Sequence, residues 1–184
     1  MPRLTVPGPD HLAPDERRVW DMIASGPRGR VEGPLRIWVK SPGLAEQAQA
    51  LGAYCRFGSC LPPRLSELAI LITGAHWKAK FEWHSHLPLA LAAGLCETVA
   101  ESIRLGQPPV FEREDEAAVH AFATGLIVTR QVSEAAYQRA IAALGERGVI
   151  DLVGILGYYA LVSMTLNAFE VPLPEGVSDP FIAV

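Results

Sequence analysis

Residues 64–86 read RLSELAILITGAHWKAKFEWHSH and set acidic residues and histidines among apolar ones. Apolar residues recur at helical spacing from Leu65 to Ala75, which predicts one helix. A second helix is predicted from about Lys78 to Ala93, with Pro88 inside it as a source of bending. Two antiparallel helices at this point would bring side chains from both into one pocket.

The second of these helices carries Glu82 and His86 four residues apart, on the same face. A carboxylate beside an imidazole fixes the tautomer of the ring and leaves the pair able to move a proton. Glu67, on the preceding helix, is a third member of the predicted site. We therefore take His86, Glu82 and Glu67 as the candidate catalytic residues.

Other interpretations of the same residues stay open at this point. Glu67 could pair with Arg64 on its own helix, and Glu82 could face solvent near the lysines at 78 and 80. Glu67, Glu82 and His86 could also bind a metal ion through mixed carboxylate and imidazole ligands, although no HExxH motif is present. We expect no metal.

The remainder of the chain predicts an all-α fold. Further helices are predicted for residues 43–57, 96–105, 112–130, 133–148 and 150–169, and no convincing strand pattern occurs. Residues 1–42 are expected to form an N-terminal arm with one short helix near Pro14 to Ile23, in which GPRGRVEGP is a loop. Residues 43–184 are expected to form one helical domain with a proline-rich C-terminal tail.

Composition limits the possible functions. The chain has 184 residues, 49% of them hydrophobic and 20% charged, with a net charge of -4 and no cluster of basic residues. This argues against a nucleic-acid partner, because phosphate binding needs grouped Lys and Arg. The first residues lack the apolar segment of a secretory signal, so we expect a cytoplasmic location. Leu152 to Phe169 is uncharged but is interpreted as a buried core helix, so no membrane partner is expected.

The three cysteines, Cys55, Cys60 and Cys96, fit neither a CxxC zinc site nor an even disulfide framework, and reduced thiols are the simplest interpretation. The sequence also lacks a glycine-rich phosphate loop and a GxSxG motif. We expect no cofactor. The remaining candidates for a substrate pocket are Trp83, His84 and Tyr158.

Three stretches, PPRLSELAIL, AKFEWHSHLPLALAAGL and NAFEVPLPEG, resemble the carboxymuconolactone decarboxylase superfamily, which includes the alkyl hydroperoxidase D-like proteins. The peroxidase branch carries a glutamate and then CxxCxxxH, in which the cysteines are the redox pair. By position the cysteines fall on Ala79 and Glu82, the histidine on His86 and the glutamate on Glu67. The thiol pair is therefore missing, whereas the acid and the histidine remain, as in the decarboxylase-like branch.

The resemblance implies an alkyl hydroperoxidase D-like helical bundle that assembles as a homo-oligomer, a trimer or hexamer. Our leading hypothesis is a cofactor-independent acid-base enzyme of the decarboxylase, lyase or isomerase type acting on a small organic acid, lactone or carbonyl compound. One alternative is an antioxidant peroxidase that uses Cys55 and Cys60 beside His86. Another is a non-catalytic oligomer that binds a small molecule.

Overall fold

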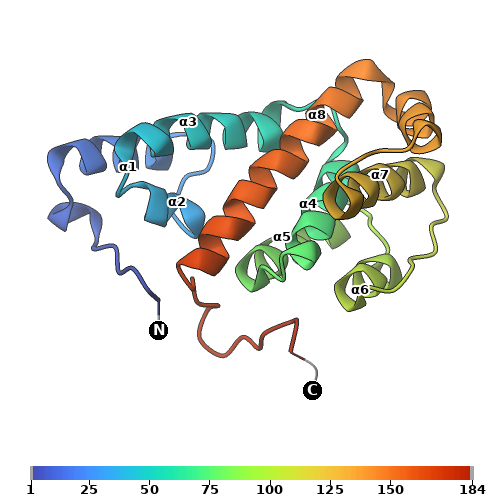
Figure 1. Ribbon diagram of the computed structural model, residues 1–184. Coiled ribbons are helices and arrows are strands. Elements are labelled where there is room, and N and C mark those ends of the chain that lie inside the picture. Colours follow the sequence, from blue (N-terminus) through green and yellow to red (C-terminus); the bar gives the residue numbers. More distant parts are fainter. Residues whose placement is uncertain (1, 183–184) are drawn as a thin grey trace.

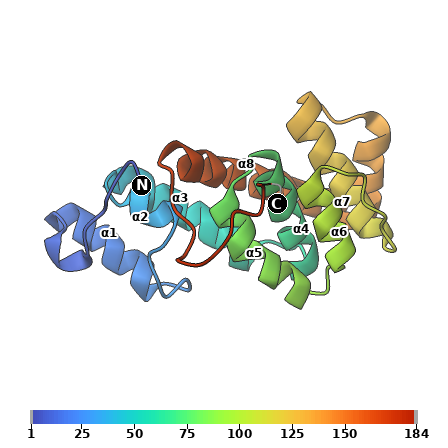
Figure 2. The same ribbon diagram turned by 90° about the horizontal axis from the view of Figure 1, so that it is seen from below.

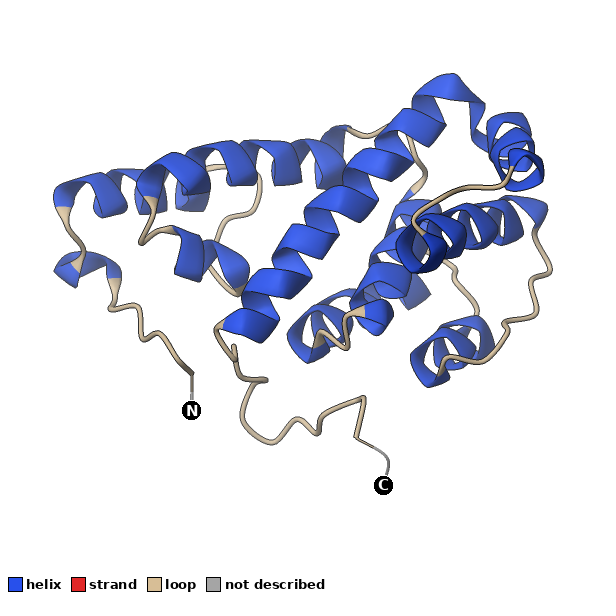
Figure 3. Ribbon diagram, viewed as in Figure 1, coloured by secondary structure: helices blue, strands red, loops and turns tan. Residues whose placement is uncertain are grey.

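The computed structural model describes residues 2–182, and these residues form helices and loops without a strand (Figures 1 and 3). This confirms the all-α prediction. The elements in chain order are a 3-10 turn (Pro9–His11), α1 (Pro14–Ser25), α2 (Pro34–Trp38), α3 (Pro42–Ala53), a π turn (Tyr54–Gly58), α4 (Pro63–His76), α5 (Lys80–Ala92), α6 (Glu97–Leu105), α7 (Glu114–Thr124), a second π turn (Gly125–Thr129) and α8 (Glu134–Ala168).

The central element is α4, which packs against α5, α6, α7 and α8. Every residue from Leu65 to Gly74 is buried. A helix buried on all sides needs apolar residues around its whole circumference, and LAILITG supplies them. Ser66, Glu67 and Thr73 are the polar exceptions within this stretch. Because polar groups are costly to bury without partners, the surroundings of Glu67 are of particular interest.

The long helix α8 crosses the molecule and bends sharply near its start (Figure 1). The sequence predicted a break at Gly148, but the structure breaks the helix at Gly145, whose φ of 70° favours glycine. Gly148 remains helical and buried against Leu144. Of the most apolar 18-residue window of α8, 61% is buried in protein, which is the behaviour of a core helix.

The N-terminal residues are more ordered than the predicted arm with one short helix. They form α1 and also α2, which begins at Pro34 after Gly33 with a φ of 55°. Leu35 and Trp38 enter the common core, and Trp38 Nε1 donates a hydrogen bond to Thr165 Oγ1 on α8 at 3.0 Å. These residues therefore pack as part of the same core as the later helices.

The C-terminal tail runs back over α5 (Figure 2). Phe181 packs edge-on against Trp83 with ring centroids 5.6 Å apart, and Asp179 lies 3.5 Å from Lys80. Arg104 on α6 donates to the Pro180 carbonyl. The tail thus covers one side of the α4–α5 pair.

Replacement of Gly52 tests how closely α3 approaches α8. A Cβ at this position would lie 2.1 Å from the Tyr158 hydroxyl, and the buried ring has little room to move. We expect Gly52→Ala to lower the free energy of unfolding by about 1–3 kcal/mol, measured by chemical denaturation.

The control is Gly154→Ala on α8, where a Cβ meets nothing within 4 Å. This substitution should raise the free energy of unfolding by roughly 1 kcal/mol through helix propensity. Equal effects of the two substitutions would contradict the close approach of α3 and α8.

Candidate active site

The α4–α5 hairpin brings the three predicted residues together. A short turn joins the helices, with Lys78 at a φ of 48°, and folds α5 back along α4. His86 Nδ1 lies 2.6 Å from Glu67 Oε2, and His86 Nε2 lies 2.9 Å from Glu82 Oε1. Pro88 lies within α5 but does not separate these side chains. Each ring nitrogen therefore faces its own carboxylate.

All three side chains are buried, with residue exposures of 8% for Glu67, 4% for Glu82 and 4% for His86. Burial alone would lower the pKa of His86, but the negative charges of Glu82 and Glu67 and the hydrogen bond to Glu67 outweigh it. The pKa of His86 is raised to about 9. At neutral pH the ring is an imidazolium, which carries a proton on both nitrogens and can donate rather than accept one.

One oxygen of Glu82, Oε1, is ion-paired but not hydrogen-bonded among the described residues. It is close to His86 Nε2, but the N–H direction is unsuited to a hydrogen bond, so the contact is mainly electrostatic. Among residues 2–182, this buried oxygen has no hydrogen-bond partner. Glu82 also lines the cavity described next, and a carboxylate with lone pairs not used in hydrogen bonds can accept a proton from a molecule bound there.

A cavity of about 90 Å³ opens beside Glu82 and His86. Two tyrosines from α8 form one wall, and three arginines from the N-terminal half of the chain lie around it. These residues are Tyr158, Tyr159, Arg28, Arg30 and Arg56. The site thus combines a buried acid-base group with cationic side chains.

The two tyrosines are neutral hydroxyl groups at ordinary pH. Burial raises the pKa of Tyr158 to about 12 and that of Tyr159 well above its usual value, with the charge of Glu82 adding to both. The ring of Tyr159 stands edge-on to His86, with centroids 5.2 Å apart. Their O–H groups are available to stabilise a developing negative charge on a ligand.

The fold has clear relatives among solved structures. A protein of unknown function from Agrobacterium tumefaciens, whose name refers to AhpD and antioxidant defence, matches with a TM-score of 0.66 and 16% identity over 78% of this chain and 99% of its own. An uncharacterized peroxidase-related protein from Ralstonia eutropha, described as an alkylhydroperoxidase AhpD core, matches with a TM-score of 0.75 and 14% identity over 98% of this chain and 94% of its own. The chain has the AhpD fold.

No protein-family model matches the sequence, and no curated protein does. At these identities the likeness extends to the fold, which confirms the predicted alkyl hydroperoxidase D-like bundle. The chemistry has to be argued from the side chains that this AhpD fold holds in its site.

The alternative pairings considered for the two glutamates do not occur. Arg64 turns to α7, where it forms ion pairs with Asp115 at 2.7 Å and with Glu116. Lys80 lies against Asp179 on the tail. Glu67 and Glu82 therefore interact with His86 instead.

Trp83 and His84 do not line the cavity, contrary to the prediction, whereas Tyr158 does. Successive residues of a helix point about 100° apart, and α5 presents Phe81, Glu82, Ser85 and His86 to the cavity. Trp83 is buried against Phe181 instead. Arg28 and Arg30 were missed because their loop, residues 26–34, was interpreted only as a series of turns, and Arg56 was missed because it lies in the π turn that ends the preceding helix.

The cysteines lie outside the cavity lining. Burial raises the pKa of the Cys55 thiol to about 11, and burial with hydrogen bonding to Asp151 raises that of Cys60. Cys96, hydrogen-bonded to Thr98 at the start of α6, has a lowered pKa. Two of the three thiols are therefore poor thiolates in this AhpD fold.

Metal ligation by Glu67, Glu82 and His86 is not supported by their geometry. Among the described residues, no group of three or more His, Cys, Asp or Glu side chains has an arrangement that could hold a metal ion. The physical reason is that both nitrogens of His86 are occupied by carboxylates, and an imidazolium has no lone pair to offer.

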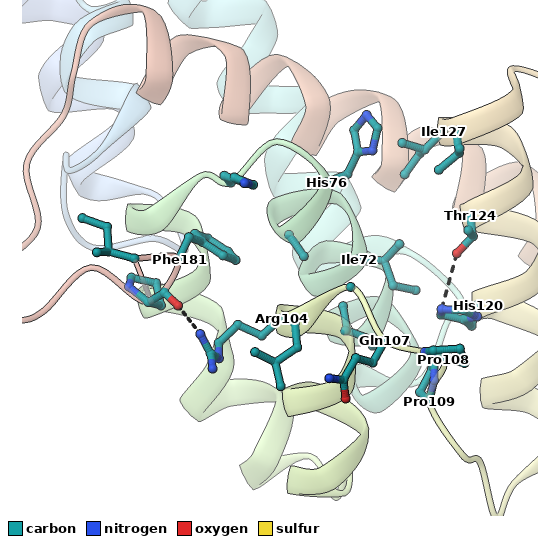
Figure 4. Close-up of a pocket in the computed structure, with 18 of the residues that line it drawn as sticks. Ile72, His76, Arg104, Gln107, Pro108, Pro109, His120, Thr124, Ile127 and Phe181 are labelled. Atoms are coloured by element: carbon teal, nitrogen blue, oxygen red, sulfur yellow. Dashed lines mark hydrogen bonds between the residues drawn. The ribbon is translucent and has the colours of Figure 1, made fainter. Parts of the chain in front are cut away.

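A larger cavity of about 1100 Å³ lies between α4, α6, α7 and the tail (Figure 4). It is mainly apolar, and its histidines are His76 and His120. Burial lowers the pKa of His120, whose Nε2 lies 3.4 Å from Thr124 Oγ1. No carboxylate is paired with either histidine among residues 2–182, so this cavity lacks the acid-base arrangement seen at His86.

Titration of His86 tests the electrostatics of the site. The pKa of His86, about 9 in the folded protein, exceeds its ordinary value of 6.5, so its stabilising contribution is complete below about pH 6.5 and is lost as the pH rises through 9. The difference corresponds to on the order of 3 kcal/mol. NMR of labelled histidines should give a pKa near 9, and Glu67→Gln should lower it.

The control variant for this titration is Glu101→Gln, which removes an exposed carboxylate paired with Arg104 on α6. It should leave the titration of His86 unchanged. A His86 pKa at or below 6.5 in the unmodified protein would contradict the ion-pair arrangement.

Proposed function

We propose that this protein is a cofactor-independent acid-base enzyme that acts on a small organic acid, lactone or carbonyl compound. The observation that carries the proposal is His86 held between two buried carboxylates, with His86 and one of those carboxylates, Glu82, lining a cavity. Perturbed groups that converge on a cavity are typical of active sites.

In the proposed mechanism Glu82 is the base. It removes a proton from a substrate carbon next to a carbonyl group, and the electron pair of that C–H bond moves to form an enolate. The charge of the His86 imidazolium and the tyrosine hydroxyls stabilise the enolate oxygen. Return of the proton to a different carbon completes an isomerisation. In a decarboxylation no C–H bond is broken: the bond to the carboxylate breaks, CO2 leaves, the electron pair of that bond forms the enolate, and the His86 imidazolium donates a proton to the carbon.

His86 and Glu67 have separate roles in the proposed mechanism. The raised pKa of His86 suits it to deliver a proton rather than to remove one. Glu67 holds Nδ1 and so orients the ring, which makes it a positioning residue. The expected proton shuttle is thus divided between a carboxylate base and an imidazolium acid.

The alternatives receive less support. A thiol peroxidase would need a reactive thiolate beside His86, whereas the pKa values of Cys55 and Cys60 are raised and neither lines the cavity. A simple binding protein would have no need to bury three coupled ionisable groups at one point. We also propose a cytoplasmic homo-oligomer, and the exposed apolar residues Ile150, Val153 and Met164 on α8 support the assembly.

Substitution of the acid-base residues tests the proposal. A panel of small lactones and oxo acids should contain a compound that the protein turns over after its thiols have been alkylated. Glu82→Gln and His86→Ala should each lower kcat by about 10²- to 10⁴-fold, because each removes a proton-transfer group. Glu67→Gln should lower kcat less and shift its pH dependence.

His84→Gln is the matched control, since His84 is on the same helix but outside the cavity lining. Its kcat should equal that of the unmodified protein. Turnover that vanishes on alkylation, or that survives both Glu82→Gln and His86→Ala, would contradict the acid-base mechanism.

A further inference from the structure

Arg28 enters the cavity without a carboxylate partner. It comes from the loop between α1 and α2, and its Nη2 lies 3.4 Å from the hydroxyl of Tyr158. Its Nε is buried and has no hydrogen-bond partner among residues 2–182, and its guanidinium forms no ion pair with them. Buried guanidinium groups normally have partners, so this one, on the cavity lining, lacks a counter-charge that a ligand could supply.

The packing around Arg28 leaves space for the guanidinium at this position. A Cβ on Gly52 of α3 would lie 2.4 Å from Arg28 Nη2 and 2.1 Å from the hydroxyl of Tyr158. Both groups therefore occupy space that only glycine leaves free. The pair of donors is consequently set beside the acid-base groups of α5.

The second cation on this wall is Arg56 in the π turn after α3. Its guanidinium rests near the ring of Phe57, 5.6 Å from the centroid, and it makes no ion pair with the described residues. Arg30, by contrast, is 3.2 Å from Glu32 and is neutralised. Two uncompensated positive charges therefore line the cavity.

The ionised groups around His86 do not fully neutralise the charges of Arg28 and Arg56. Glu67, Glu82 and the His86 imidazolium together carry one negative charge when both carboxylates are ionised. Against Arg28 and Arg56, this leaves the cavity with one surplus positive charge. A bound monoanion would balance it, and a low-dielectric site rewards such a balance.

We propose that Arg28, assisted by Arg56 and Tyr158, binds the carboxylate of a small monoanionic substrate and presents the neighbouring carbon to Glu82. The planar fork of a guanidinium matches a carboxylate with two parallel hydrogen bonds. Glu82 on the cavity lining, with Glu67 next to it on the far side of His86, repels a second negative charge, which favours a carboxylate over a phosphate dianion. The presentation of carbon to Glu82 rests on the proposed function, whereas the binding of the anion does not.

NMR titration of the full chain tests the anion subsite. Acetate and 2-oxobutanoate are the carboxylate probes, acetamide is the neutral isostere, and inorganic phosphate at a pH above its second pKa is the dianion. Both carboxylates should bind saturably and shift the Arg28 Nε–H signal, whereas acetamide and phosphate should bind at least tenfold more weakly. Arg28→Gln should weaken carboxylate binding by about 10- to 100-fold.

Two further variants separate charge from geometry and control for general charge effects. Arg28→Lys keeps the charge but loses the fork, so its affinity should fall between those of the unmodified protein and Arg28→Gln. Arg139→Gln removes a surface arginine paired with Glu114 and should leave binding unchanged. Binding that is insensitive to Arg28→Gln in a folded variant, or equal for acetate and acetamide, would overturn the subsite, as would tighter binding of phosphate.

The same titrations in Glu82→Gln and His86→Ala distinguish the two proposals. If the unmodified protein turns over no compound of the panel but binds carboxylates in a way that depends on Arg28, the subsite would be sustained and the enzyme function rejected. Turnover that needs Glu82 and His86, with carboxylate binding and KM unchanged by Arg28→Gln, would reject only the subsite.

Discussion

The structure depends on compensation of charge inside an apolar core. His86 and two glutamates are almost fully buried, and each of these groups would be costly to desolvate alone. They are tolerated because the imidazolium lies between the carboxylates, at 2.6 Å from one and 2.9 Å from the other. This requirement fixes the register of α5 against α4, since a shift of one residue would remove an oxygen from its nitrogen.

A separate group of ion pairs prevents Arg64 from pairing with Glu67. Arg64 lies one turn before Glu67 and would be its natural partner on an isolated helix. In the folded chain Arg64 binds Asp115 and Glu116 at the start of α7, so the carboxylate of Glu67 is left for His86. Packing of α7 on α4 is therefore part of how the candidate site acquires its charge state.

Local patterns were enough for much of this arrangement. Helical periodicity predicted α4 and α5, and the i,i+4 spacing predicted that Glu82 and His86 meet. The bend of α8 was misplaced because Gly145 and Gly148 are equivalent in sequence, and only packing of Gly148 against Leu144 decides between them. The place of Arg28 in the site could not be predicted from local patterns, because its contact Tyr158 is 130 positions away in the sequence.

The chemistry proposed for this protein differs from that of a thiol peroxidase at one place on α5. By the spacing of the peroxidase pattern, its two thiol positions fall on Ala79 and Glu82. Ala79 is completely buried at the start of α5, while Glu82 lines the cavity beside His86. A thiolate there would form a covalent bond to oxygen or sulfur and then need a reductant. A carboxylate beside an imidazolium exchanges only protons, and each turnover can restore it without a second substrate.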